Sequence, residues 1–285
     1  MFSLERLKGL FSYGWKLLVS SLINVAYIDL RTLIIGKIYT AADLAFYNRA
    51  AYFPRFIVGN INTSIDSVLL PTMSAEQDDK SRVRSMTRRA IKTSTYLMMP
   101  CMVGLAVCAE PIVRLILTEK WLSCVPFLRI FCFTYAFYPI HTANLNAIKA
   151  IGRSDLFLKL EILKKIVGLI AILSTMWISV LAMAYSALVT SVFCQLINSW
   201  PNRKLLDYKY LDQFKDMLPQ IMLSLGMGVI VYCINFIGLN DILTLLIQLP
   251  LGAVLYIAGS KLFKIDSFEY LSSMILGFLR KRRKA

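Results

Sequence analysis

Apolar stretches, each about as long as a membrane-spanning helix, recur along the whole sequence. A helix needs about 20 predominantly apolar residues to cross a bilayer. The chain is 57% hydrophobic and only 17% charged, whereas soluble domains are about a quarter charged. The sequence therefore predicts an all-α polytopic membrane protein with about eight transmembrane helices, near residues 12–35, 53–74, 93–117, 125–148, 157–176, 178–199, 214–237 and 241–262.

The fifth stretch is the least apolar of the eight. Lys159, Glu161, Lys164 and Lys165 lie in or beside its first half. Merging it with the sixth stretch would give one apolar run too long for a bilayer. Two helices are the better interpretation, with the lysine side chains extended toward the membrane surface.

The basic residues are distributed as expected for a multi-pass membrane protein. The formal net charge is +15. If the N-terminus is cytoplasmic and eight helices cross, the inner segments hold 24 Lys and Arg and the outer connections hold three. This bias predicts a cytoplasmic location for both termini. It also argues against a nucleic-acid partner, because no long basic surface remains outside the apolar stretches.

No motif in the sequence predicts an enzyme. A nucleotide-binding GxxxxGK[ST] loop and the hydrolase motifs HExxH and GxSxG are absent. The six cysteines are scattered through apolar stretches, which is typical of buried free thiols, and a single histidine cannot build a metal site. We expect neither a cofactor nor a metal.

Polar side chains follow one face of each of the first two predicted helices. On the first helix they recur at steps of three and four residues, at Tyr13, Lys16, Ser20, Asn24, Tyr27 and Arg31. On the second, the same steps join Arg55, Gly59, Asn62 and Asp66. Charged groups are costly in lipid and normally face a protein interior or a water-filled cavity. The two helices are therefore expected to line one cavity, although the stripes could also pair with each other across the helices.

The residue types in these stripes suggest what the cavity binds. Lys16, Arg31 and Arg55 offer cationic donors suited to phosphate. Asn24, Asn62 and Tyr27 offer hydrogen-bonding groups and a ring face for sugars. The predicted substrate-binding residues are these six.

Two further residues are predicted to couple transport to an ion gradient. Asp66 and His141 are titratable and lie in apolar stretches, and a histidine changes charge near neutral pH. A histidine satisfied within the protein interior is the competing interpretation.

Several segments resemble a known family. They are Ile34-Ile35-Gly36-Lys37 followed by Ala41-Ala42-Asp43-Leu44 and Tyr47-Asn48-Arg49, then residues 60–71, Glu119-Lys120-Trp121 and residues 150–155. Their order and spacing are similar to those of Wzx-type polysaccharide flippases of the MOP superfamily, in particular the colanic acid exporter-like subgroup.

The resemblance implies a fold, a function and a set of partners. Residues 1–201 would form the second six-helix lobe of such a flippase, 202–265 two additional transmembrane helices, and 266–285 an amphipathic and basic cytoplasmic tail. The implied function is to move polyprenyl-pyrophosphate-linked oligosaccharides across the cytoplasmic membrane for surface polysaccharide biosynthesis, including lipopolysaccharide and O-antigen. The implied partners are that lipid-linked oligosaccharide, membrane lipids and a separately encoded N-terminal lobe.

Other functions stay open at this point. A multidrug or lipid II exporter of the same superfamily would have a similar sequence pattern. A scaffold for glycan enzymes, or a truncated remnant without transport activity, would also be compatible with it. A membrane glycosyltransferase is the enzyme alternative, but the short predicted outer connections leave little room for a catalytic loop.

Overall fold

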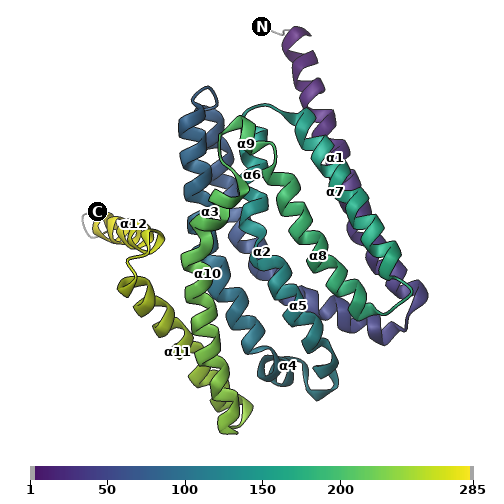
Figure 1. The fold of residues 1–285 in the computed structure, drawn as a ribbon, viewed down its shortest axis with the longest axis vertical. Helices are drawn as coiled ribbons and strands as arrows, with labels where there is room; N and C mark the ends of the chain where they lie inside the picture. Colours follow the sequence, from purple (N-terminus) through teal and green to yellow (C-terminus); the bar gives the residue numbers. More distant parts are fainter. Residues whose placement is uncertain (1–3, 283–285) are drawn as a thin grey trace.

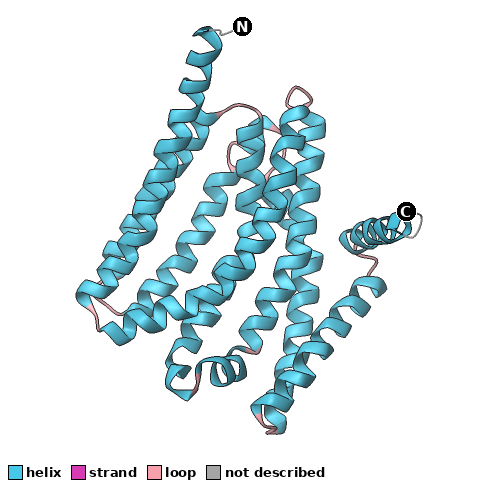
Figure 2. Cartoon of the chain, turned by 180° about the vertical axis from the view of Figure 1, so that it is seen from behind, coloured by secondary structure: helices cyan, strands magenta, loops and turns pink. Residues whose placement is uncertain are grey.

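The computed structural model describes residues 4–282, and within that range it leaves out the side chains of residues 4–10, 12, 13, 26, 28, 29 and 275–282. Every regular element in the described part is a helix, and no strand occurs there (Figure 2). The elements are α1 (Leu4–Ile38), α2 (Ala41–Ala75), α3 (Lys80–Val107), α4 (Ala109–Leu117), η1 (Glu119–Cys124), α5 (Val125–Ala136), α6 (Tyr138–Ala150), α7 (Ser154–Thr175), α8 (Val180–Ser199), α9 (Asn202–Leu205), α10 (Tyr210–Cys233), η2 (Ile234–Ile237), α11 (Asp241–Leu262) and α12 (Asp266–Arg282).

The predicted all-α membrane fold is confirmed, whereas the exact count of eight spans stays a prediction. Each predicted stretch falls on helix, but the third is divided between α3 and α4 and the fourth between α5 and α6. Six helical segments of the described chain are long and apolar enough to cross a membrane. Helices α2 and α7 are not among them, because α7 carries several charged side chains and α2 is rich in polar ones.

Side-chain caps fix where the long helices begin. Thr40 and Asp43 form a reciprocal capping box at the start of α2. Asp79 accepts two backbone N–H bonds at the start of α3, and Ser179 and Asn240 each accept one at the starts of α8 and α11. These caps satisfy backbone donors that have no partner within the helix. They place tight reversals between successive helices, so the chain runs up and down the bundle.

The helices pack side by side in one bundle, with α1 and α7 paired at one edge and α10 and α11 at the other (Figure 1). Fully buried methionine and isoleucine side chains, among them Met73, Ile91 and Met98, fill the centre between α2, α3 and their neighbours. Helix α10 lies closely along α3, where a Cβ atom on Gly228 would be 2.5 Å from Val103 Cγ1. The glycine thus permits this close approach.

Helix α12 runs across the axis of the other helices (Figure 1). Its residues Phe268 and Leu271 pack against the apolar cluster that contains Met227 and Tyr256. This is the arrangement expected of an amphipathic helix at a membrane surface. The basic residues of the predicted tail, at positions 280–284, lie outside the described side chains.

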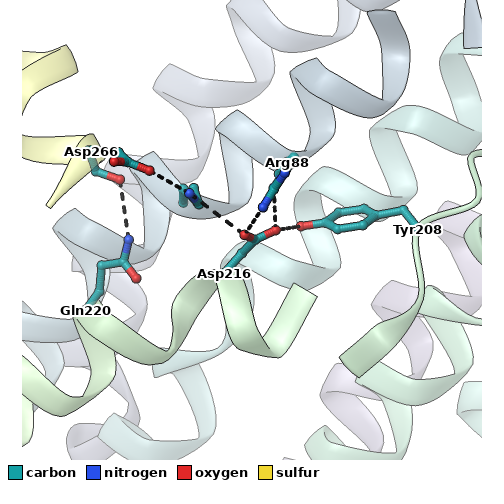
Figure 3. A network of polar contacts seen from close by, with 7 residues as sticks. Arg88, Tyr208, Asp216, Gln220 and Asp266 are labelled. Carbon is teal, nitrogen blue, oxygen red and sulfur yellow. Dashed lines mark hydrogen bonds and ion pairs between the residues drawn. The ribbon is translucent and has the colours of Figure 1, made fainter. Parts of the chain in front are cut away.

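A polar network ties α12 and α10 to α3 (Figure 3). Arg88 on α3 donates from Nε and Nη2 to the Asp216 carboxylate of α10 at 2.7 and 2.6 Å. Tyr208 donates to the same carboxylate at 2.8 Å, and Lys92 donates to Asp266 of α12, also at 2.8 Å. Burial, together with the Asp216 carboxylate, raises the pKa of the Tyr208 phenol. The Lys92 ammonium holds the pKa of the Asp266 carboxyl below its usual value.

Candidate functional site: a cationic cavity

A cavity of about 540 Å³ lies within the bundle, lined by residues of α1, α2, α5, α6, α7 and α8. Its volume is in the range of small-molecule sites. Its lining includes six charged side chains: five cations, Arg31, Arg55, Lys149, Lys164 and Lys165, and one carboxylate, Glu161. Asn24 and Arg55 are exposed, so the cavity reaches the surface beside α1 and α2. The cavity therefore carries an excess of positive charge in a predominantly apolar protein.

Two arginines line the part of the cavity near the α1–α2 connection. Arg31 is buried, and its Nη1 donates to the Met183 carbonyl at 2.9 Å and to Tyr47 Oη at 3.5 Å. Arg55 donates from Nε to Tyr135 Oη at 2.8 Å. Both guanidinium groups are held by neutral partners, so their positive charges stay uncompensated by these contacts. Such groups can bind an anion without first breaking an ion pair.

The lysines and the glutamate come from α7 and α6, farther along the cavity. Lys164 Nζ donates to Glu161 Oε1, and Lys165 Nζ lies 4.0 Å from Oε2. Lys165 also donates to Asn24 Oδ1 of α1 at 2.6 Å. Lys149 on α6 lines the same space and lies over the ring of Phe157 at 4.7 Å.

Aromatic side chains form much of the remaining wall. Tyr27, Tyr47, Tyr135 and Tyr138 all line the cavity. Lys165 Nζ lies 4.5 Å from the centre of the Tyr27 ring. Tyr27 in turn packs directly on the backbone of α7, because a Cβ atom on Gly168 would lie 2.0 Å from its Oη. The wall thus combines flat faces with phenolic hydroxyls, which suits the binding of sugar rings.

The structure brings five of the eight predicted site residues to this cavity. Asn24, Tyr27, Arg31, Arg55 and His141 line it. Their roles in binding or coupling stay predictions.

Three predicted site residues are not among the described residues that line the cavity. Lys16 is half-buried on α1. Asn62 is buried, and its Oδ1 has no hydrogen-bond partner in the described part of the chain. Asp66 accepts a bond from Asn146 Nδ2 at 2.5 Å. The polar stripe of α2 therefore diverges from the cavity after Arg55, and the Tyr13 side chain of the α1 stripe lies outside the described residues.

His141 is held by an amide. Its Nδ1 lies 2.8 Å from Asn198 Nδ2 of α8, and its ring lies 5.6 Å from that of Tyr138. The histidine is thus hydrogen-bonded to a neighbouring helix within the cavity wall. No group of three or more metal-ligating side chains occurs among the residues that the structure describes.

The expectation that the α7 lysines extend to the membrane surface is wrong for Lys164 and Lys165. Their side chains are only 11% and 15% exposed and line the cavity, whereas Lys159 is exposed. The sequence does contain the relevant signal: Glu161, Lys164, Lys165 and Gly168 follow the spacing i, i+3, i+4, i+7 of one helix face. Which way that face points depends on α1, which covers it.

Comparisons with known proteins agree with this architecture. A family described as "Polysaccharide biosynthesis protein" matches residues 1–126. The teichuronic acid biosynthesis protein TuaB of Bacillus subtilis (strain 168) is 23% identical over 262 residues, which are 90% of this chain and 54% of TuaB. The lipopolysaccharide biosynthesis protein WzxC of Escherichia coli (strain K12) is 26% identical over 163 residues, 57% of this chain and 33% of WzxC.

Two further relatives extend these matches. An uncharacterized membrane protein in the cps region of Klebsiella pneumoniae is 26% identical over 209 residues, 73% of this chain and 41% of that protein. The fold is similar to that of the lipid II flippase MurJ in an inward closed conformation, with a TM-score of 0.72 and 19% identity over 93% of this chain and 56% of MurJ. The chain spans about half the length of TuaB and less of the other two curated relatives.

The chain is thus a multi-pass membrane protein with relatives among bacterial polysaccharide biosynthesis proteins. Its resemblance to the Wzx-type polysaccharide flippases of the MOP superfamily is confirmed.

Proposed function

We propose that the chain is part of a flippase that moves polyprenyl-pyrophosphate-linked oligosaccharides across the bacterial cytoplasmic membrane for surface polysaccharide biosynthesis. The observation that carries this proposal is the cavity itself. Five cations and one carboxylate line a cavity inside a helical membrane bundle. Placing such charges in the membrane costs free energy, which an anionic ligand in the cavity would offset. A pyrophosphate group supplies two negative charges to such a site.

The parts of the cavity suggest how a lipid-linked sugar would be held. Arg31 and Arg55 would bind the pyrophosphate oxygens in forked hydrogen bonds. The tyrosine rings and Asn24 would contact the sugars. The prenyl chain would stay in the lipid, so only the polar head needs a path through the protein. Transport then requires binding and movement and no bond is broken, which is why we propose a transporter and not an enzyme.

We also propose the division of the chain and its orientation. Residues 1–201 would form one six-helix lobe, 202–265 two additional transmembrane helices and 266–285 a cytoplasmic tail, with both termini in the cytoplasm. The exposed side of the cavity, at Asn24 and Arg55, would face an N-terminal lobe, either encoded separately or in the same longer protein. The likeness to slightly more than half of MurJ supports this division.

The test replaces both cavity arginines in the bacterium that encodes the chain. Arg31→Gln combined with Arg55→Gln should lower surface polysaccharide by at least about tenfold, because each lost charge-assisted bond weakens binding by about 1.5–3 kcal/mol. Surface glycan is measured by extraction and blotting, and protein abundance in the membrane by immunoblot. The matched control is Arg82→Gln with Arg84→Gln, two exposed arginines paired outside the cavity, which should export normally.

Normal export by the cavity double variant would refute the pyrophosphate hypothesis. Unchanged surface glycan together with altered drug resistance would indicate a multidrug exporter. A block in cell-wall growth would indicate a lipid II exporter.

A further inference from the structure

The imidazole ring of His141 uses only one of its two nitrogens within the protein. His141 is half-buried on α6 and lines the cavity. Its Nδ1 lies 2.8 Å from Asn198 Nδ2 of α8, and no hydrogen bond to its Nε2 is formed by the described residues. A histidine that only filled the interior would be expected to have partners for both nitrogens. Nε2 is therefore available to a ligand of the cavity.

Asn198 determines which nitrogen of this ring carries the proton. The nitrogen of a side-chain amide only donates, so Asn198 Nδ2 is the donor and His141 Nδ1 is the acceptor. A protonated imidazolium ring has no acceptor nitrogen, so this contact requires the neutral ring. The single ring proton then lies on Nε2, because the hydrogen bond of one nitrogen fixes the state of the other.

The burial of Asn198 supports this positioning role. Asn198 is 0% exposed, and its Oδ1 has no hydrogen-bond partner in the described part of the chain. The ring of His141 is thus the only described group to which this side chain is bonded. Burying an amide with an unmade hydrogen bond destabilises a fold. The contact with His141 is what Asn198 contributes to the cavity wall in return.

A row of aromatic rings connects His141 with the arginine end of the cavity. Arg55 donates to Tyr135 Oη at 2.8 Å. The ring of Tyr135 lies 6.1 Å from that of Tyr138, which lies 5.6 Å from the imidazole ring. All four side chains line the cavity. His141 is therefore two ring contacts away from the guanidinium group that the proposed function assigns to the pyrophosphate, on the part of the wall assigned to the sugars.

A fixed donor distinguishes between the polar groups that sugars carry. A hydroxyl group both donates and accepts, so it can bind either tautomer of a neutral imidazole ring. A carbonyl oxygen only accepts, so it requires the ring proton on the nitrogen that faces it. Holding the proton of His141 on Nε2 therefore favours a sugar with a carbonyl-bearing substituent.

We propose that Tyr138, His141 and Asn198 form a sugar subsite for a carbonyl oxygen, such as that of an acetamido group. The inference rests on the proposed function, because it takes a lipid-linked oligosaccharide as the ligand. His141 Nε2–H donates to the carbonyl oxygen, and the Tyr138 ring packs against the sugar. Asn198 does not touch the sugar and acts as a positioning residue, which keeps the ring proton on Nε2.

The first measurement determines the tautomer directly. The chain contains one histidine, so isotope-labelled histidine reports on His141 alone when the full chain is purified in detergent with a tag that lacks histidine. Nitrogen NMR distinguishes a protonated from an unprotonated ring nitrogen. We expect the proton on Nε2 in the unmodified chain and a mixture of both tautomers in Asn198→Leu. A proton on Nδ1 in the unmodified chain would overturn the inference, and this result depends on no variant.

The second measurement compares the binding of two prenyl pyrophosphoryl disaccharides by calorimetry. One carries an acetamido group where the other carries a hydroxyl group. His141→Leu should weaken binding of the acetamido form at least about fivefold, because its carbonyl oxygen loses its donor in a buried site. Binding of the hydroxyl form should weaken by less than about twofold, since a hydroxyl group can turn to another partner.

Asn198→Leu links the two measurements. Its affinity for the acetamido form should fall in proportion to the fraction of rings that NMR shows with the proton on Nδ1, because only the other tautomer binds. The matched control is Asn60→Leu. Asn60 also donates one hydrogen bond, to the Phe56 carbonyl of its own helix, but lies outside the cavity. This control should keep the tautomer and both affinities of the unmodified chain.

The outcomes separate this inference from the proposed function. Unchanged binding of both disaccharides by His141→Leu would overturn the subsite and leave the pyrophosphate hypothesis standing. Equal weakening of both disaccharides would overturn the preference for a carbonyl oxygen. Absence of binding of either disaccharide to the unmodified chain would overturn both the inference and the pyrophosphate hypothesis.

Discussion

The cavity and the polar network at α12 are built from the same residue types but in opposite ways. In the cavity, five cations share one carboxylate, and the two arginines are held by hydroxyl and carbonyl oxygens. In the network, Asp216 accepts a two-bond fork from Arg88, and Lys92 lies between Asp216 and Asp266 (Figure 3). The network matches its charges within the protein, whereas the two arginines of the cavity have neutral hydrogen-bond partners.

We therefore expect the paired charges of the network to stabilise the fold, and the arginines of the cavity to contribute less to stability. Asp216 is buried at 8% exposure and also accepts the Tyr208 hydroxyl, so its removal leaves neighbouring donors without a partner. Among the described residues, Arg55 donates only to the Tyr135 hydroxyl, and Arg55 is exposed. Stability measurements should therefore separate the two regions.

The largest expected difference is between Asp216→Ala and Arg55→Gln. Asp216→Ala should lower the free energy of unfolding by about 2–3 kcal/mol, because it removes charge-assisted bonds and leaves the buried Tyr208 hydroxyl unpaired. Arg55→Gln should change it by less than about 1 kcal/mol, since the guanidinium is exposed and its loss removes only a solvent-screened interaction. Denaturant unfolding in detergent micelles measures both. Equal destabilisation by the two variants would show that the cavity charges are structural.

An intermediate effect is expected where α1 and α7 meet beside the cavity. Gly168→Ala should destabilise the chain by about 1–3 kcal/mol, because the new methyl group overlaps the Tyr27 ring and overpacks the contact. Gly59→Ala is the control: a Cβ atom there meets nothing within 4 Å, so the substitution should be neutral or stabilising by up to about 1 kcal/mol. Thermal unfolding monitored by circular dichroism compares them. A stable Gly168→Ala protein would mean that α1 can separate from α7 at little cost.

The smallest effect is expected for the pH dependence of α12 docking. Lys92 lowers the pKa of Asp266, so this pair contributes stability above the ordinary carboxyl pKa and loses it as pH falls through the lowered value. Asp266 is 79% exposed, which limits the contribution to less than about 1 kcal/mol. The protection factors of the α12 amides, which correct for the slower intrinsic exchange in acid, should fall slightly as pH is lowered for the unmodified chain. In Asp266→Asn that additional fall should be absent.

Much of the fold could be predicted from local pattern. The apolar stretches, the polar stripe of α1 and the resemblance to flippases all led to an all-helical membrane bundle with Asn24, Tyr27 and Arg31 on one cavity wall. The α2 stripe was less informative, because Asn62 and Asp66 share a helix face with Arg55 yet do not line the cavity. A helix meets different neighbours along its length, and one sequence does not contain that information.

The sequence by itself determined that these helices lie in a membrane and that some of their faces are polar, because hydrophobicity and helical spacing are properties of each segment alone. Only the tertiary structure decided that the charged face of α7 turns inward and that Glu161 shares the cavity with Arg31 and Arg55. The pairing of α1 with α7 fixes that orientation. The same sequence pattern fits a lysine that extends to the membrane surface and a lysine that points into a cavity. The packing of neighbouring helices decides between the two.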